Sequence, residues 1–153
     1  MINDEFRDKN GDFRIRGRLK TWGVANINGL VFKKGSYSQF LDEYYTKFNR
    51  KPPLCYNHDI NDVIGVVDEI VCDSVGMDVY ARIFGERMTQ LLWRHITDGT
   101  LGGLSDTSRV FFDESGEVER TELLEVSIVH TPADPLANFT VYKPYKLGFL
   151  KDE

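Results

Sequence analysis

Residues that commonly bind metals are scarce in this chain of 153 residues, which holds two cysteines and three histidines. Cys55 and Cys72 lie far apart, so they form no CxxC pair, and the histidines show no HExxH spacing. Nucleotide-binding signatures are missing as well, because neither GxGxxG nor a P-loop segment occurs. The sequence therefore predicts no metal site and no cofactor.

Long apolar stretches are also absent. No run approaches the roughly 18 apolar residues of a membrane-spanning helix, and the N-terminal segment MINDEFRDKNGDFRIRG lacks the apolar centre of a signal peptide. Two cysteines are too few for a disulfide framework in a chain of this size. We therefore expect a soluble, unexported protein of a reducing cytoplasm that does not enter a membrane.

An excess of positive charge is lacking too, since the formal net charge is −5 and the pI is about 5.2. A mildly acidic chain has no general attraction for nucleic acid or for anionic membranes. One local exception is the period-two series Arg14, Arg16, Arg18 and Lys20, which would share one face of a strand. Such a series is either a basic binding stripe or, as is commoner, a solvated strand face.

The chain has the size and composition of one globular domain. Hydrophobic residues make up 41% and charged residues 28%, which is near the globular average and argues against disorder. Aromatic residues reach 12%, which suits a β-rich core. We therefore expect residues 1–153 to form a single domain, with residues 1–12 as a flexible N-terminal segment.

Alternation of apolar and polar residues predicts more strand than helix. Strands are expected at residues 13–21, 54–56, 64–71, 77–84, 101–112, 122–130 and 139–142, and helices at residues 36–49 and 86–97. Ser36 or Ser38 is the expected cap of the first helix. Several strands follow one another as hairpins. This pattern predicts a mainly β fold, a closed or nearly closed antiparallel β-barrel of six or seven strands with helices packed outside it.

Three histidines could serve as a general base. His58 follows the apolar extended piece 54–56 and is expected at a strand end, where it faces either a cleft or solvent in a turn. His95 lies within a predicted helix and is more simply a packed or half-exposed side chain. His130 ends a predicted strand and has a weaker claim on catalysis than His58.

Ser105 and Glu125 could complete a catalytic set with a histidine. Ser105 follows two glycines, which would let another backbone approach closely, although turn serines are common. Glu125 lies among apolar strand residues, and a buried carboxylate there needs a partner, such as the N–H of a catalytic imidazole. The plainer alternative for Glu125 is the solvated face of its strand.

Four stretches in the same order resemble the caudovirus prohead serine proteases, from about Gly17 to Ala137. They are VFKKGSYSQFL, LCYNHDINDVIGVVDEI, ITDGTLGGLSDTSRV and LLEVSIVHTPADPLA. The resemblance implies a fold similar to that of the herpesvirus assemblins. It also implies that Ser105 is the nucleophile, that His58 is its base and that Glu125 replaces the second histidine of the assemblins, for which role His130 keeps a minor claim.

Two departures from the family pattern carry expectations of their own. Asp106 and Thr107 follow Ser105, where the family usually has an apolar residue and a glycine, so an extra charge would lie beside the nucleophile and alter substrate preference or oppose oxyanion formation. His130 and Asp134 vary the turn after the Glu-Val-Ser strand, which leaves the donors of the oxyanion hole unnamed.

By the resemblance, the chain is a serine endopeptidase of phage head maturation. It would cut the scaffold protein and the N-terminal arm of the major capsid protein inside the procapsid, in the host cytoplasm, and would cleave and associate with itself. One alternative is a catalytically inactive protein of the same fold that acts as a scaffold or capsid-assembly module. Another is a small β-barrel that binds nucleic acid, which the acidic pI disfavours.

Overall fold

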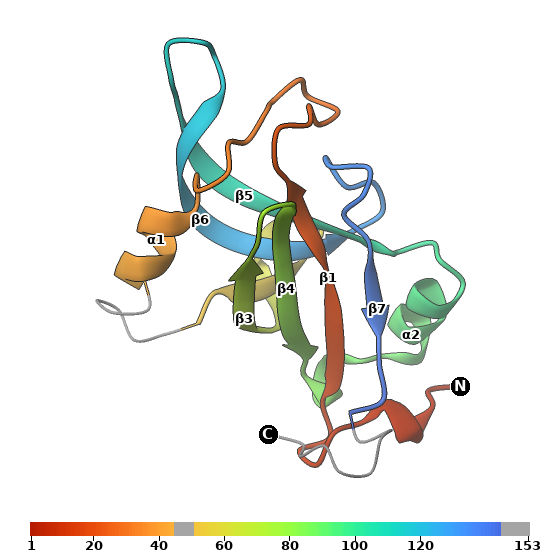
Figure 1. Ribbon diagram of the computed structural model, residues 1–153. Coiled ribbons are helices and arrows are strands. Elements are labelled where there is room, and N and C mark those ends of the chain that lie inside the picture. The colour runs from red at the N-terminus through yellow and green to blue at the C-terminus, as the bar shows by residue number, and fades with distance from the viewer. Residues whose placement is uncertain (45–50, 145–153) are drawn as a thin grey trace.

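The computed structural model describes residues 1–44 and 51–144 of the chain. Seven strands dominate the described residues (Figure 1). They are β1 (Phe13–Thr21), β2 (Pro53–Tyr56), β3 (Asp59–Cys72), β4 (Gly76–Ile83), β5 (Gly103–Phe112), β6 (Val118–Val129) and β7 (Phe139–Val141). The helices are α1 (Ser38–Glu43) and α2 (Gln90–Thr97), with short 3-10 turns η1 (Asp4–Phe6) and η3 (Gly85–Arg87).

The strands form one curled sheet in the order β5-β6-β2-β3-β4-β1-β7. The two edge strands approach each other at one end, where Gly103 and Asn138 form a bridge and the Leu104 N–H donates to Ala137 O at 2.8 Å. The sheet is therefore a half-barrel with helices outside it, which confirms the predicted fold class. One pair departs from the expected pattern, because β2 and β6 run parallel.

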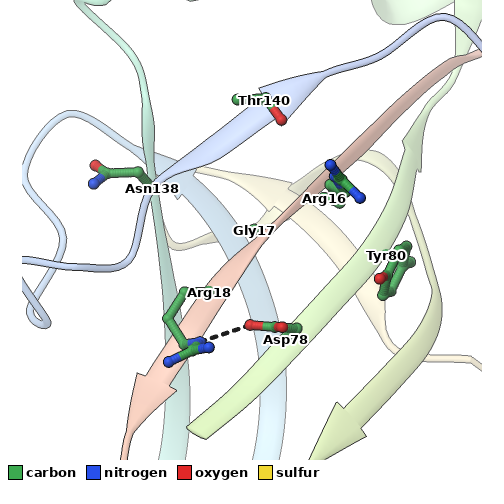
Figure 2. Close-up of a pocket in the computed structure, with 7 residues that line it drawn as sticks. All are labelled: Arg16, Gly17, Arg18, Asp78, Tyr80, Asn138 and Thr140. Carbon is green, nitrogen blue, oxygen red and sulfur yellow. Dashed lines mark hydrogen bonds and ion pairs between the residues drawn. The ribbon is translucent and has the colours of Figure 1, made fainter. Parts of the chain in front are cut away.

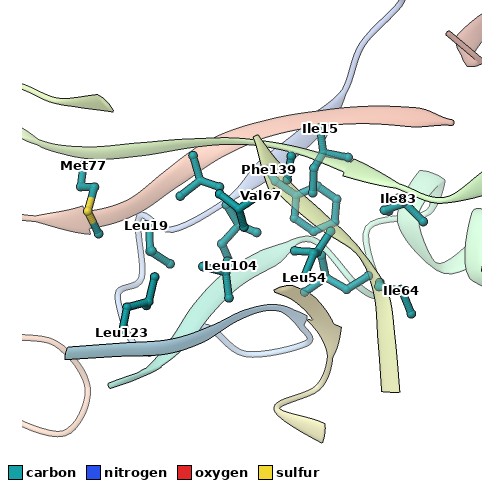
Figure 3. Close-up of a cluster of buried hydrophobic side chains, with 14 of the residues drawn as sticks. Ile15, Leu19, Leu54, Ile64, Val67, Met77, Ile83, Leu104, Leu123 and Phe139 are labelled. Carbon is teal, nitrogen blue, oxygen red and sulfur yellow. The ribbon is translucent and has the colours of Figure 1, made fainter. Parts of the chain in front are cut away.

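Apolar side chains from the strands meet inside the curl (Figure 3). Ile15, Leu54, Leu104 and Ile128 come from four different strands and are each no more than 1% exposed. Full burial of one such side chain stabilises the fold by about 1.5–3 kcal/mol. Strand alternation thus places one face of each strand in the core and leaves the other available for a site.

Gly17 lets the last strand lie against β1. A Cβ at this position would lie 2.3 Å from the carbonyl oxygen of Asn138 and 2.8 Å from Cα of Phe139. Both are backbone atoms, which cannot move aside as a flexible side chain could. A side chain at residue 17 would therefore push β7 off the sheet and open the half-barrel further.

Two helix predictions need correction at their starts. Tyr37 is the N-cap of α1 and makes no side-chain cap hydrogen bond, so neither Ser36 nor Ser38 caps it; residues 45–49 of that prediction lie outside the described residues. The predicted helix 86–97 is interrupted, since η3 comes first and α2 begins only at Gln90. Thr89 caps α2, and its hydroxyl accepts from the Leu92 N–H at 3.0 Å.

The N-terminal segment packs against the half-barrel. Phe6, in η1, lies 5.4 Å from the ring of Trp93 in α2, measured between ring centroids. Asp8 is buried and accepts from the backbone N–H of Asp12 at 3.0 Å. These contacts give residues 1–12 a defined place, while their predicted flexibility in solution stays a prediction. No helix in the described ranges is both long enough and apolar enough to cross a bilayer.

Candidate active site

His58 lies in a two-residue turn that joins β2 to β3. Tyr56 pairs with Asp59 across the turn, and both Asn57 (φ 50°) and His58 (φ 63°) have positive φ. Positive φ at both central residues is typical of the type I′ turns that join hairpin strands, and Asn and His tolerate this backbone conformation better than most residues. His58 is therefore at a strand end, as the sequence predicts.

The turn is docked onto β6 through its backbone. The Asn57 N–H donates to Ile128 O at 3.0 Å, and the His58 N–H donates to Ser127 Oγ at 2.9 Å. The parallel pairing of β2 with β6 carries the turn to this place, because Tyr56 pairs with Ile128 at its end.

Four polar side chains share the outer face of the β5–β6 pair. Ser105 pairs with Ser127, and Thr107 pairs with Glu125. Residues directly opposite each other in an antiparallel pair project to the same face, and so do residues two apart in one strand. The register therefore brings these four side chains together on the side of the sheet away from the core.

His58, Glu125 and Ser127 form a closed hydrogen-bonded ring. The imidazole Nδ1 lies 3.0 Å from Glu125 Oε2, the Ser127 hydroxyl donates to Glu125 Oε1 by a short bond, and the His58 N–H donates to Ser127 Oγ. Glu125 is 2% exposed, so both of its oxygens are satisfied within a buried site. We assign the proton to Nδ1, because an ionised carboxylate can only accept; the lone pair of the neutral ring then lies on Nε2.

Ser105 lies on the same outer face and is 7% exposed. No hydrogen bond joins its hydroxyl to the His58 ring in the part of the chain that the structure describes. Ser105 and Thr107 are two residues apart, about 7 Å along the strand, and Thr107 contacts the ring. Catalytic hydrogen bonds are often long in free enzymes, so the roles of Ser105, His58 and Glu125 stay predictions.

Thr107 contributes a contact that the sequence did not predict. Its Oγ1 lies 3.1 Å from His58 Nδ1, so the Nδ1 proton is shared between Glu125 and the Thr107 oxygen. The signal was the period of the strand, which places residue 107 on the same face as residue 105. Pairing with Glu125 could not be read from the sequence, because it depends on the β5–β6 register.

The expected charge beside the nucleophile does not face the site. Asp106 points to the interior of the half-barrel, where its side chain is 3% exposed and its Oδ1 lies 2.6 Å from Lys20 Nζ. Its Oδ2 accepts from Tyr37 Oη at 2.6 Å and from Ser108 Oγ at 2.5 Å. Burial raises the pKa of Asp106, but Lys20 and the two hydroxyl donors outweigh burial and hold this pKa below its usual value. The prediction that Asp106 places a charge next to the oxyanion is therefore wrong.

The other two histidines lie elsewhere. The ring of His130 bonds to Thr100 O through Nδ1 at 2.8 Å. His95 lies in α2, and its Nδ1 is buried without a hydrogen-bond partner among the described residues. The structure thus brings Glu125, rather than His130, to the His58 ring.

Cys55 is the nearest thiol to the site. It is fully buried in β2 and pairs with Ser127. Burial, followed by the negative charges of Glu125 and other carboxylates, raises the pKa of its thiol to about 11. The thiolate is the reactive form of cysteine, so Cys55 is poorly suited to be a nucleophile at neutral pH.

Gly103 leaves room for the side chain of Pro132, which packs against it. A Cβ at Gly103 would lie 2.7 Å from Cδ of Pro132, whose ring covers the start of β5. The glycine was expected to allow the approach of another backbone before Ser105. At Gly103 the space is instead taken by the turn that follows β6.

The basic series near the N-terminus is divided between two faces. Arg14 lies 3.2 Å from Asp8, and Arg18 lies 2.6 Å from Asp78, both on the outside of β1. A register shift between Arg18 and Lys20 turns Lys20 inward to Asp106. The four cations therefore do not form one stripe. Lys20 belongs neither to a basic binding stripe nor to a solvated strand face, the two predicted alternatives.

A shallow pocket lies beside this outer face of β1. Figure 2 shows that side chains of β1, β4 and β7 border it, with the Arg18–Asp78 ion pair at one side. Its lining residues are Arg16, Gly17, Arg18, Asp78, Tyr80, Asn138 and Thr140. None of them belongs to the cluster around His58. Among the described residues, no three His, Cys, Asp or Glu side chains are grouped so that they could hold a metal ion.

Comparison with known proteins identifies relatives of this arrangement. The family model described as caudovirus prohead serine protease matches residues 14–145, which confirms the resemblance. The bacteriophage T4 capsid assembly protease superposes with a TM-score of 0.60 at 15% identity, over 76% of this chain and 80% of that one. The KSHV protease, solved with a hexapeptide phosphonate inhibitor, gives a TM-score of 0.57 at 11% identity, over 86% of this chain and 65% of that one. No curated protein sequence gives a significant match.

Proposed function

Since this chain belongs to the caudovirus prohead serine protease family, we propose that it is a serine endopeptidase of phage head maturation. Ser105 is the nucleophile, His58 the general base and Glu125 the group that orients and stabilises the imidazole. The observation that carries this proposal is the hydrogen bond between His58 Nδ1 and the buried Glu125 Oε2 at 3.0 Å. It fixes the tautomer in which Nε2 can accept a proton.

The proposed reaction proceeds through an acyl-enzyme. His58 Nε2 takes the hydroxyl proton as Ser105 Oγ attacks the scissile carbonyl carbon, which gives a tetrahedral oxyanion and an imidazolium next to Glu125. The imidazolium then donates its proton to the leaving amine as the C–N bond breaks. Water, activated by the same Nε2, hydrolyses the ester. Backbone N–H groups would bind the oxyanion.

A small movement is required before the first step. The ring is held at Nδ1 by Glu125 and Thr107, while Ser105 lies further along the same face of β5. His58 is exposed, with 40% of its side chain accessible. Bending of β5 by a bound peptide would bring Ser105 Oγ to Nε2 while the hydrogen bond between Nδ1 and Glu125 is kept.

The proposed substrates are the scaffold protein and the N-terminal arm of the major capsid protein, with self-cleavage and self-association inside the procapsid. Support comes from the family, which is that of the caudovirus prohead serine proteases, and from the similar fold of the bacteriophage T4 capsid assembly protease. A substrate in extended form would add as a strand along an open edge of the sheet. The cytoplasm of the host, within the procapsid, is the proposed place of action.

A fluorophosphonate probe tests the chemistry without a known substrate. An activated serine displaces fluoride from phosphorus, so the wild-type protein should gain one adduct that peptide mass spectrometry maps to Ser105. Ser105→Ala should give no adduct, and His58→Ala should label at least about 10³-fold more slowly, since the hydroxyl is a weak nucleophile without its base. Adducts on other serines at the same rate in all three proteins would contradict the proposal.

A second candidate, an inactive protein that keeps the protease fold as an assembly module, has one observation in its favour. Ser105 Oγ makes no hydrogen bond to His58 within the described residues. Co-expression of the capsid precursor with wild type and with Ser105→Ala separates the two functions. Equal processing, or equal absence of processing, together with unimpaired assembly in both cases, would favour the inactive module.

A further inference from the structure

We propose that Ser127 is a positioning residue of this protease, which aligns Glu125 and His58 through a single hydroxyl group. The inference rests on the proposed function, because it concerns the same site. Among the described residues, Ser127 Oγ bonds to the His58 N–H and to Glu125 Oε1 and makes no hydrogen bond to Ser105 Oγ, so it acts through these two neighbours. Neither the family match nor the structural neighbours assign it this role.

Ser127 is placed where its hydroxyl can reach only the site. It is fully buried in β6, between Cys55 of β2 and Ser105 of β5 in the sheet. Its side chain projects to the outer face, away from the apolar interior that Val126 and Ile128 help to form. A buried hydroxyl needs hydrogen-bond partners, and this one has them in His58 and Glu125.

The first effect of Ser127 is on the carboxylate. Its hydroxyl donates to Glu125 Oε1, which leaves Oε2 as the oxygen that accepts from His58 Nδ1. A carboxylate that is 2% exposed has little water to satisfy its second oxygen. Without this donor, Oε1 would compete for the imidazole N–H or turn toward solvent, and the ring would lose its single orientation.

The second effect is on the backbone that carries the histidine. The hydroxyl oxygen accepts from the His58 N–H at 2.9 Å, at a residue whose φ is 63°. A left-handed backbone conformation at a non-glycine residue persists only where its surroundings hold it. The same hydroxyl therefore fixes both the backbone position of His58 and the orientation of the Glu125 carboxylate.

This closed arrangement makes a prediction that an ordinary packing role does not. If Ser127 acts chiefly through Glu125, most of the effect of removing its hydroxyl should disappear in a Glu125→Gln variant, where only the smaller effect on the His58 backbone remains. Residues that act as one unit show non-additive effects on rate. A hydroxyl that only packs would instead lower the rate by the same factor in either background.

Thr121 offers a matched control on the same strand. It is 1% exposed, and its hydroxyl donates to Ser36 O at 3.2 Å, far from the His58 cluster along β6. Thr121→Val removes one buried hydroxyl with almost no change in shape, as Ser127→Ala does. Any effect of losing a buried hydroxyl from β6 in general should appear in both variants.

The test measures the fluorophosphonate labelling rate of Ser105 per folded molecule, with the folded fraction taken from urea unfolding. Ser127→Ala should slow labelling on the order of 10²-fold, as a small misplacement of a catalytic group does, while Thr121→Val stays within about twofold of wild type. When Ser127→Ala is added to Glu125→Gln, the labelling rate of Ser105 should fall by less than about a further threefold. Ser127→Cys, which keeps the volume but is a weak donor, should be slow as well and serves if the alanine variant does not fold.

The outcomes separate this inference from the function on which it rests. Wild type that never labels at Ser105 would overturn the proposed function. Wild type that labels, with Ser127→Ala or Ser127→Cys at the wild-type rate per folded molecule, would overturn the role of Ser127 alone. The role of Ser127 would also be overturned if Ser127→Ala slowed labelling by the same factor in the Glu125→Gln background as in wild type. The hydroxyl would then act independently of Glu125.

Discussion

Two neighbouring residues of β5, Ser105 and Asp106, face opposite sides of the half-barrel and belong to opposite kinds of environment. On the outer side, Ser105 lies among hydroxyl groups, one buried carboxylate and a half-exposed imidazole. On the inner side, Asp106 belongs to an ion pair with Lys20 that the core encloses, with side chains 3% and 7% exposed. One peptide unit separates the proposed chemistry from a purely interior contact.

The difference between the two sides shows how the sheet separates reactivity from stability. The inner cluster has both of its charges compensated and its acceptor oxygens occupied by Tyr37 and Ser108. The outer cluster leaves one imidazole nitrogen and one serine hydroxyl without hydrogen bonds in the described residues. Satisfied groups stabilise a fold, whereas unsatisfied and accessible groups can react. Substitutions on the two sides should therefore change different measurements.

The largest effect is expected on the outer side from Glu125→Gln. The amide keeps the shape but lacks the charge that stabilises an imidazolium and fixes its tautomer, so the labelling rate of Ser105 should fall by about 10⁴-fold. This corresponds to about 5.5 kcal/mol of transition-state stabilisation. The labelling rate with the fluorophosphonate probe measures it. A loss of stability without a loss of labelling rate would mean that Glu125, like the inner cluster, contributes to stability and not to the reaction.

The next largest effect is expected on the inner side from Asp106→Asn. Lys20 would keep its charge in a buried position without a counterion, and breaking one partner of a buried pair costs about 3–5 kcal/mol of unfolding free energy. Urea unfolding checks this value. Labelling of Ser105 per folded molecule should stay within about tenfold of wild type, since Asp106 faces away from the site. A rate loss as large as that of Glu125→Gln would contradict the separation of the two sides.

Removing both charges should partly restore stability. In Lys20→Met with Asp106→Asn, no buried charge remains, and the amide oxygen can still accept from Tyr37 and Ser108. The double variant should be about 1–3 kcal/mol more stable than Asp106→Asn alone, since apolar replacement of a buried pair is often neutral or favourable. Urea unfolding of the four proteins gives the coupling energy. A double variant less stable than the single one would mean that Lys20 acts on its own, for example through Phe32, whose ring centroid lies 4.4 Å from Nζ.

The inner side should also make the stability depend on pH. The pKa of Asp106 is lower in the folded protein than its usual value, because Lys20 and two hydroxyl groups outweigh the effect of burial. Its contribution is therefore present above the unfolded pKa of about 3.9 and is lost as the pH falls through the folded pKa. The unfolding free energies of wild type and Asp106→Asn should converge as the pH falls from about 5 toward 3. A constant difference over this range would mean that the carboxylate is not the source of the stability.

The smallest effect is expected from Thr107→Val, again on the outer side. Its oxygen shares the Nδ1 proton at 3.1 Å, while Glu125 is the charged acceptor of the same proton. Loss of a neutral, solvent-exposed partner should slow labelling by less than about tenfold, because a typical hydrogen bond contributes about 1 kcal/mol. The labelling rate of Thr107→Val measures the loss of this oxygen, and Thr107→Ser, which keeps a hydroxyl oxygen, is the control and should stay near the wild-type rate. A larger loss than that of Glu125→Gln would make Thr107 the main partner of the ring.

The strands could be predicted from alternation because each has one buried face. β4 follows this rule closely, because every second residue from Met77 to Ile83 is buried, whereas in β2 the neighbours Leu54 and Cys55 are both buried. Alternation along β5 also places Asp106 with buried Leu104, so its inward direction was readable, although its partner was not. Lys20 escaped prediction because a register shift after Arg18 reverses the faces of β1.

The candidate site was predictable only as separate residues. His58, Ser105 and Glu125 stand out because of their chemistry and because of the family resemblance, but their approach depends on long-range pairing. The parallel alignment of β2 with β6 and the β5–β6 register set that approach, and neither leaves a local signal. The roles of the Ser127 and Thr107 hydroxyl groups could not be predicted for the same reason, since these groups acquire their partners only in the folded sheet.

The bulge in the β5–β6 pair marks the point where the alignment of these two strands changes. Thr107 pairs with Glu125 but Ser108 pairs with Leu123, so Leu124 is an extra residue at this point. If the register of β5 shifted by one residue, Ser105 would face the apolar interior and the charged Asp106 would face outward. A chain with this misaligned register would lose the buried ion pair of Asp106 and the outward position of Ser105 together, so one register supports both the stability of the fold and the proposed site.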